Sequence, residues 1–171
     1  MILSDKDIIK MIKQGKIKIT PLKKDQIGPA SVDLTLSDRW YFFKKTLMGK
    51  TVDLDKTPFT KAYEQKTSKS IMLKTGEMCL AKTVEKIKLS NSVMGKLEGR
   101  SRYARMGLII HMTSALVQPG SDNHQVLEIA NLSPFLIKLH AGMRISQVVF
   151  EEMKSSTSKP YAKFGKIARK Q

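Results

Sequence analysis

The spacing of apolar residues near the start of the chain changes from the period of a helix to that of a strand. Ser4 is followed three residues later by Asp7, the pattern of a capping box, and apolar residues cluster over 8–12 before Gly15. This pattern predicts a short N-terminal helix. Over 31–36, apolar residues alternate with polar ones, which is the period of a half-buried strand.

Short strand-like segments then recur along the chain, separated by turns rich in Gly, Pro, Asn and Ser. The predicted strands are 40–44, 70–73, 78–82, 107–112, 125–131, 135–139 and 144–150. Short strands at regular spacing are typical of a sandwich, jelly roll or barrel. The polar, lysine-rich segment 48–69 is predicted to be a long surface excursion, such as a lid or an interface arm.

The length of 171 residues is that of about one domain, and we place it at 1–153. The tail 154–171 has six basic and no acidic side chains and too few apolar ones to pack a core. It is expected to be either a disordered end or a mobile flap that closes over an anionic ligand.

Thirty-one basic and 15 acidic side chains give a net charge of +16, which attracts an anionic partner. Nucleic acid, a phosphorylated metabolite and acidic lipid all remain open, as does a merely solvated lysine-rich surface. One cysteine and three histidines disfavour disulfides and a zinc site. Because no long apolar run or secretory signal occurs, we expect a soluble, cytoplasmic protein without a membrane partner.

Two polar features interrupt the strand pattern. The segment 99–105 holds three arginines, a serine and a glycine, which together could cradle phosphate or form an exposed basic turn. Glu128 shares one face of a predicted strand with Val126 and Ala130, so its carboxylate is either a general base or a solvent-facing side chain. His111 is interpreted first as a hydrogen-bonded strand histidine and second as a catalyst.

The order of several motifs resembles the dCTP deaminases, a branch of the dCTP deaminase/dUTPase superfamily. The motifs are Ile2-Leu3-Ser4-Asp5, Pro29-Ala30-Ser31-Val32-Asp33-Leu34, Gly99-Arg100-Ser101, Ala104-Arg105, His111-x-Thr113, Pro119-Gly120, Val126-Leu127-Glu128, Gly142-Met143 and Lys159-Pro160-Tyr161. The similarity covers most of the chain and is weakest over 43–69 and after Tyr161.

This resemblance implies a mainly β, distorted jelly-roll or barrel fold of the dUTPase-like type, with a short N-terminal helix, assembled as a homotrimer with active sites between subunits. Members deaminate dCTP to dUTP and ammonia without zinc, and Mg²⁺ accompanies the triphosphate. The chain lacks the His-x-Glu motif that zinc deaminases use. Many members are inhibited by dTTP, and the sequence leaves open whether this chain is.

The resemblance also assigns roles to individual residues. Glu128 matches the catalytic glutamate, while Ser101 and Arg105 match the positions that hold the attacking water and stabilise charge. The remaining nucleotide-binding positions are Arg100, Arg102, Tyr103, Ala104, the Ser114 backbone carbonyl, Gln118, Val126, Leu127, Tyr161 and Lys163.

Three departures from the family pattern bear on the reaction. Gln118 stands where dUTPases place the aspartate that activates water, and a neutral amide is no general base. Arg102 replaces a usual serine, and the tail after Tyr161 is shorter than the common spacing. The sequence thus favours deamination to dUTP. A dUTP pyrophosphatase, alone or bifunctional, and a non-catalytic nucleotide-binding or regulatory relative that contacts nucleic acid are the alternatives.

Overall fold

The strands form one large, curled antiparallel sheet and one small one. The computed structural model describes residues 1–164. The large sheet has the order β7-β9-β5-β2-β11-β6-β8, with β1 added to β5 and β3 to β2. β10 pairs with β4 in the small sheet. The strands are β1 (Ile17–Thr20), β2 (Val32–Phe43), β3 (Tyr63–Thr67), β4 (Ser70–Leu73), β5 (Met78–Leu89), β6 (Val93–Gly99), β7 (Leu108–Ile110), β8 (Leu116–Val117), β9 (Asp122–Asn131), β10 (Ile137–His140) and β11 (Arg144–Glu152).

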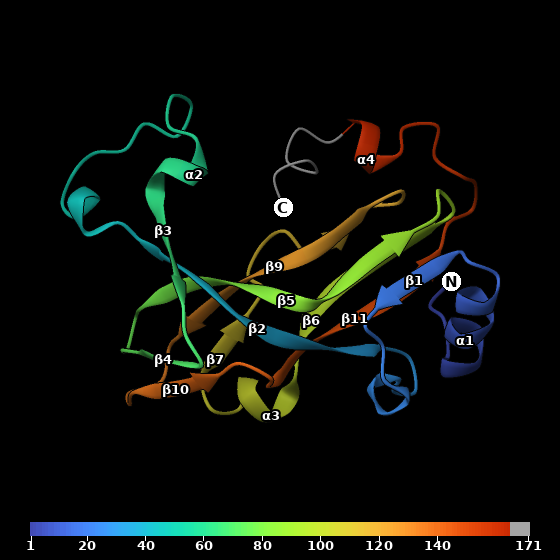
Figure 1. The fold of residues 1–171 in the computed structure, drawn as a ribbon, viewed down its shortest axis with the longest axis horizontal. Coiled ribbons are helices and arrows are strands. Elements are labelled where there is room, and N and C mark those ends of the chain that lie inside the picture. Colours follow the sequence, from blue (N-terminus) through green and yellow to red (C-terminus); the bar gives the residue numbers. More distant parts are fainter. Residues whose placement is uncertain (165–171) are drawn as a thin grey trace.

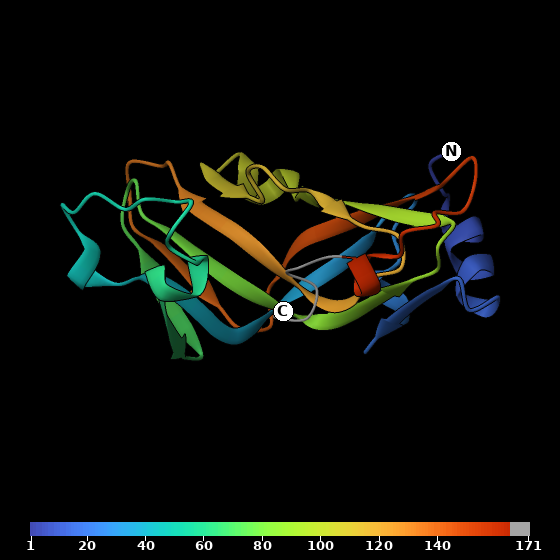
Figure 2. The ribbon, with the colours of Figure 1, turned by 90° about the horizontal axis from the view of Figure 1, so that it is seen from above.

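The helices are short and lie around the sheets (Figure 1). Seen from above, the strands of the large sheet cross one another in two layers (Figure 2). None of the helices in residues 1–164 has the length and apolar character needed to cross a bilayer. The helices are α1 (Asp5–Lys13), α2 (Phe59–Ala62), α3 (Ser101–Ala104) and α4 (Tyr161–Phe164), with 3-10 turns η1 (Lys24–Gln26) and η2 (Lys45–Leu47).

The N-terminal helix is confirmed together with its cap. The Ser4 hydroxyl accepts from the backbone N–H of Asp7, and the Asp7 carboxylate accepts from the backbone of Ser4. Ile8 and Met11 are buried against the sheet. Gly15 follows the helix with a φ of 71°, a conformation that glycine adopts without steric cost.

The mainly β prediction is confirmed, but several strands are longer than predicted or were missed. β3 lies inside the segment 48–69, which was predicted to be a surface excursion and in which no strand was identified. It escaped detection because four of its five residues are exposed and leave no apolar alternation. β6 was missed because two of its seven residues are glycines, which are uncommon in strands. At one of them, Gly95, an added Cβ would lie 2.9 Å from the Val148 side chain.

A continuous apolar core fills the curl of the large sheet. Trp40 and Phe150 are its largest fully buried side chains, and the Trp40 indole donates to the Ser68 carbonyl at 2.9 Å. β9 pairs with β5 from Met78 opposite Ala130 to Lys88 opposite Asp122, with a register shift between Lys82 and Lys86. This long pairing gives the residues of β9 a rigid base, and the candidate site is built on them.

Candidate active site

Glu128 projects from the central part of β9 on the side of the strand that does not face the core. Its neighbours Leu127 and Ile129 are fully buried, whereas Glu128 is only partly buried. Leu80 on β5 lies directly opposite Glu128 in the register. Because successive side chains of a strand point to opposite faces of the sheet, the Glu128 carboxylate lies on the face opposite Leu127 and Ile129.

Backbone N–H groups satisfy the Glu128 carboxylate. Met112 and Thr113 donate to its Oε2 atom at 3.0 and 3.1 Å, and the Thr113 hydroxyl lies 3.3 Å from Oε1. Two successive backbone donors directed at one oxygen form an anion-binding nest.

His111 shapes this nest. Its backbone N–H continues the β7–β9 ladder by donating to the Glu128 carbonyl at 2.7 Å, and its φ of 63° then turns the chain back toward the side chain of Glu128. The ring Nε2 lies 2.7 Å from the Ser114 carbonyl, which can only accept, so Nε2 carries the proton. His111 thus braces the segment 111–114, in agreement with its interpretation as a hydrogen-bonded residue.

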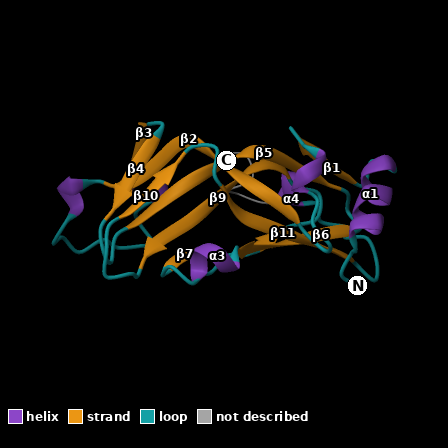
Figure 3. Cartoon of the chain, turned by 90° about the horizontal axis from the view of Figure 1, so that it is seen from below, coloured by secondary structure: helices purple, strands orange, loops and turns teal. Residues whose placement is uncertain are grey.

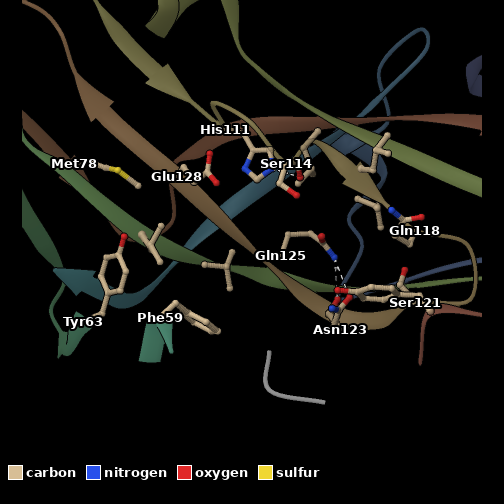
Figure 4. A pocket seen from close by; sticks show the side chains of 16 residues that line it. Phe59, Tyr63, Met78, His111, Ser114, Gln118, Ser121, Asn123, Gln125 and Glu128 are labelled. Carbon is tan, nitrogen blue, oxygen red and sulfur yellow. Dashed lines mark hydrogen bonds between the residues drawn. The ribbon is translucent and has the colours of Figure 1, made fainter. Parts of the chain in front are cut away.

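A cavity of about 330 Å³ opens beside Glu128 (Figure 4). In the picture, Glu128, His111 and Ser114 gather at one end, and Gln118, Ser121 and Asn123 at the other. Burial, and secondly the negative charge of Glu128, raise the pKa of the lining Tyr63 hydroxyl above its ordinary value. The full lining is Phe59, Tyr63, Met78, Leu80, Leu97, His111, Ser114, Leu116, Val117, Gln118, Ser121, Asn123, Gln125, Val126, Glu128 and Tyr161.

The cavity contains no lysine or arginine among the described residues that line it. Its polar end is neutral, being made of amides and hydroxyls, and the Gln125 amide donates to the side chain and carbonyl of Asn123 at 3.3 Å. A ligand that carries several phosphates needs cations, which this part of the chain does not place in the cavity.

The start of the tail reaches the cavity. The N–H groups of Tyr161 and Ala162 donate to the carbonyls of Pro119 and Gly120 at 3.0 and 3.2 Å. Pro160 lies against Gly120, where an added Cβ would be 2.6 Å from the Pro160 Cβ. These contacts seat α4 on the turn before β9 and bring Tyr161 into the lining. Residues 165–171, which the flap prediction also covers, lie outside the described part.

The arginine-rich segment is not in the cavity. It forms α3, which lies beside β7, apart from α4 (Figure 3). Ser101, Arg102 and Arg105 are exposed on it. The Arg100 guanidinium instead points at the Asp33 carboxylate at 3.2 Å and donates to the Arg144 carbonyl at 3.1 Å. Within one chain, the predicted phosphate cradle and the predicted general base are therefore separate.

The structure thus divides the predicted site residues into two groups. Glu128, Ser114, Gln118, Val126 and Tyr161 line the cavity together. The residues away from it are Arg100, Ser101, Arg102, Tyr103, Ala104 and Arg105 around α3, Leu127, whose side chain faces the core, and Lys163, which is exposed on α4.

Several lining residues were missed by sequence reasoning. Phe59 and Tyr63 come from the segment predicted to be a surface excursion such as a lid or an interface arm, but the sequence singled out neither residue as part of a site. Asn123 and Gln125 are buried amides two residues apart on β9. Their spacing was a signal in the sequence, because polar residues at buried strand positions demand partners.

Comparison with known proteins gives a consistent family. The family described as dCTP deaminase-like matches residues 2–153. A relative from Methanosphaera stadtmanae, named dCTP deaminase, dUMP-forming, is 37% identical and covers 94% of this chain and 83% of its own length. A relative from Thermomicrobium roseum, named dCTP deaminase, is 36% identical over 94% of this chain and 84% of its own.

Solved structures show the same fold. The 2'-deoxycytidine 5'-triphosphate deaminase from Agrobacterium tumefaciens superposes with a TM-score of 0.69 at 25% identity, over 88% of this chain and 48% of that one. A dUTPase of Staphylococcus bacteriophage 80alpha superposes with a TM-score of 0.52 at 13% identity, over 84% of this chain and 94% of that one. The dUTPase-like fold predicted from the sequence is confirmed.

The contact between Pro160 and Gly120 predicts how the tail can be undocked. Gly120→Ala would force Pro160 away and release Tyr161 from the cavity, so trypsin should cleave after Lys163 several-fold faster than in the wild-type chain. Gly142→Ala is the matched control, because it has the same left-handed strain with no atom near the added Cβ. Equal cleavage rates in the two variants would show that Pro160 does not hold the tail.

Proposed function

The chain belongs to the dCTP deaminase-like family, and from this premise we propose that it hydrolyses the amino group of dCTP with Glu128 as general acid and base. The observation that carries the proposal is the Glu128 carboxylate, held in place at the wall of a cavity by hydrogen bonds from the N–H groups of Met112 and Thr113. The relatives supply the substrate, since their names specify dCTP deamination.

The reaction follows from the position of this carboxylate. Water adds through its oxygen to C4 of the cytosine ring while Glu128 takes one of its protons. The carboxyl group passes this proton to N3 of the ring, which leaves a hydroxyl and an amino group on a tetrahedral C4. Glu128 then takes the proton of this hydroxyl and delivers it to the amino nitrogen. The C4 carbonyl forms as the bond between C4 and the amino nitrogen breaks, and ammonia leaves. Oε1 is the oxygen suited to this task, because its one contact, with the Thr113 hydroxyl, is long and leaves acceptor capacity free.

We propose that a second copy of the chain completes the site. The triphosphate needs cations that the described lining lacks, and Ser101, Arg102 and Arg105 stand exposed on α3 without facing their own cavity. The resemblance to the family implies a homotrimer. In such an assembly, α3 of one subunit can face the cavity of the next. The arginines would then bind phosphate oxygens and stabilise charge at the reacting ring.

Mg²⁺ enters this proposal as part of the substrate. The described residues contain no cluster of three or more His, Cys, Asp or Glu side chains that could cage an ion. A magnesium ion that arrives on the triphosphate needs no such cage, because it keeps phosphate and water oxygens as ligands. No step of the deamination is assigned to it.

A separate question is whether the reaction ends at dUTP or continues to dUMP. Several relatives besides the one from Methanosphaera stadtmanae are named dUMP-forming, so the expectation that the reaction stops at dUTP finds no support in these names. Their names favour a second step, release of pyrophosphate from dUTP. In this chain Gln118 lines the cavity and cannot act as a base, and Glu128 is the one carboxylate among the described lining residues.

Glu128→Gln should abolish ammonia release from dCTP, with a loss of about 10⁴-fold or more, because the amide cannot accept the proton from water. Binding of Mg·dCTP, measured by calorimetry, should stay within a few-fold of wild type. Loss of binding in a folded variant would make Glu128 a structural residue, and residual turnover near the wild-type rate would remove it from the chemistry.

Product analysis with dCTP and dUTP tests the second step. We expect dUTP to accumulate before any dUMP forms, because Gln118 leaves pyrophosphate release without its usual base. Gln118→Asp should then raise the rate of dUMP formation while Gln118→Asn does not. If the wild-type chain forms dUMP with no free dUTP, another group activates water in the second step.

A further inference from the structure

A second cavity, of about 280 Å³, lies next to the one that Glu128 lines. Four residues line both cavities, namely Phe59, Tyr63, Leu80 and Val126. The second cavity therefore begins at a wall of the candidate active site. Nothing in the reaction proposed above occupies it.

The sheet forms the floor of the second cavity. Leu80 on β5 lies opposite both Glu128 on β9 and Tyr41 on β2. Tyr41 in turn lies opposite Gln65 on β3. Paired residues of neighbouring strands share a face of the sheet, and the strands are about 4.8 Å apart. Leu80, Tyr41 and Gln65 all line the second cavity, so its floor extends from Leu80 across two further strands, away from Glu128.

Aromatic side chains form much of the wall. Tyr41, Phe59 and Tyr63 each contribute a ring. The Tyr63 ring stacks on that of Phe43 with the centroids 4.5 Å apart, which fixes its orientation. Phe59 and Tyr63 lie beside each other at the edge of the first cavity (Figure 4), and Phe59 is 46% exposed. Rings that are held in place yet open to solvent are surfaces on which a planar base can stack.

Lys82 is the one charged side chain among the described residues that line the second cavity. Burial, and secondly the charge of Arg39 on β2, lower the pKa of its ammonium group below the ordinary value. In the described part of the chain, neither cation forms a salt bridge. Lys86 and Lys88 of β5 differ, since they pair with Asp122 at 3.0 and 3.3 Å. Two neighbouring cations without a carboxylate partner favour an anionic ligand.

Aromatic rings beside unpaired cations match the two parts of a nucleotide. We propose that the second cavity binds a second nucleotide, with the base between the aromatic side chains and the phosphates on Lys82 and Arg39. The volume is at the lower limit of small-molecule pockets, roughly 300 Å³, so the cavity holds the base while the phosphates lie at its rim. Because Phe59 and Tyr63 belong to both cavities, a nucleotide bound here touches a wall of the candidate active site.

Binding of ATP, measured by calorimetry without dCTP, tests the site. Lys82→Met and Lys88→Met each remove one positive charge from β5, but only Lys82 lines the second cavity. Lys82→Met should weaken ATP binding about tenfold or more, because a charge-assisted contact is lost. Lys88→Met should stay within twofold of wild type. Equal losses in the two variants would mean that ATP only responds to the net charge, and the inference would be wrong.

A pair of Gln→Trp variants locates the ligand. Gln65 lines only the second cavity and Gln118 only the first, and both side chains are exposed. Gln65→Trp fills the second cavity and should abolish ATP binding, whereas Gln118→Trp should leave it within twofold. The opposite pattern would place ATP in the first cavity and overturn the proposal.

Inorganic tripolyphosphate separates the base from the phosphates. The wild-type chain should bind ATP at least tenfold more tightly than tripolyphosphate, which has no base to stack in the cavity. Equal affinities, or no binding of ATP, would contradict the inference.

Ammonia release from dCTP is assayed in parallel, and Gln65→Trp should retain it. Absence of ammonia release from the wild-type chain with the pattern of ATP binding intact would overturn the proposed function alone. Ammonia release without ATP binding would overturn the second nucleotide site alone.

Discussion

The half-buried carboxylate of Glu128 needs hydrogen-bond donors, and the rest of the site depends on how the chain supplies them. Pairing of β7 with β9 brings the backbone of His111 to Glu128, and the left-handed turn at His111 directs the next two N–H groups at Oε2. The His111 ring fixes the turn by holding the Ser114 carbonyl. Backbone donors therefore fix the position of the carboxylate, and the described cavity lining places no lysine or arginine beside it.

Charged side chains are distributed unevenly between the cavity beside Glu128 and the rest of the surface. The described cavity wall is neutral apart from Glu128, while the arginines of α3 are exposed at a different place on the surface. Two other arginines are already paired with carboxylates of their own chain, Arg100 with Asp33 and Arg144 with Asp25. In the proposed assembly, Arg102 and Arg105, which are exposed, would be available to bind phosphate across the subunit interface.

The sequence predicted the parts of this arrangement that depend on local pattern. Alternation around Glu128 placed the carboxylate away from the core, and the capping box of α1 predicted the first helix. It could not predict which distant segments meet. Tyr63 faces the cavity because β3 pairs with β2, and the exposed residues of β3 give no periodic signal for that pairing. The ion pair between Arg100 and Asp33 was likewise out of reach of sequence reasoning, because the two residues lie far apart in the sequence.

The central claim, that one chain supplies the base and another the cations, is tested most directly by mixing two inactive variants. Glu128→Gln and Arg105→Ala chains are co-refolded in equal amounts, and ammonia release from dCTP is measured once native mass spectrometry shows mixed oligomers. If sites form between subunits, about one quarter of them combine an intact Glu128 with an intact Arg105, and activity returns to about that fraction of wild type. If both residues serve the cavity of their own chain, mixed oligomers stay inactive, and the account is contradicted.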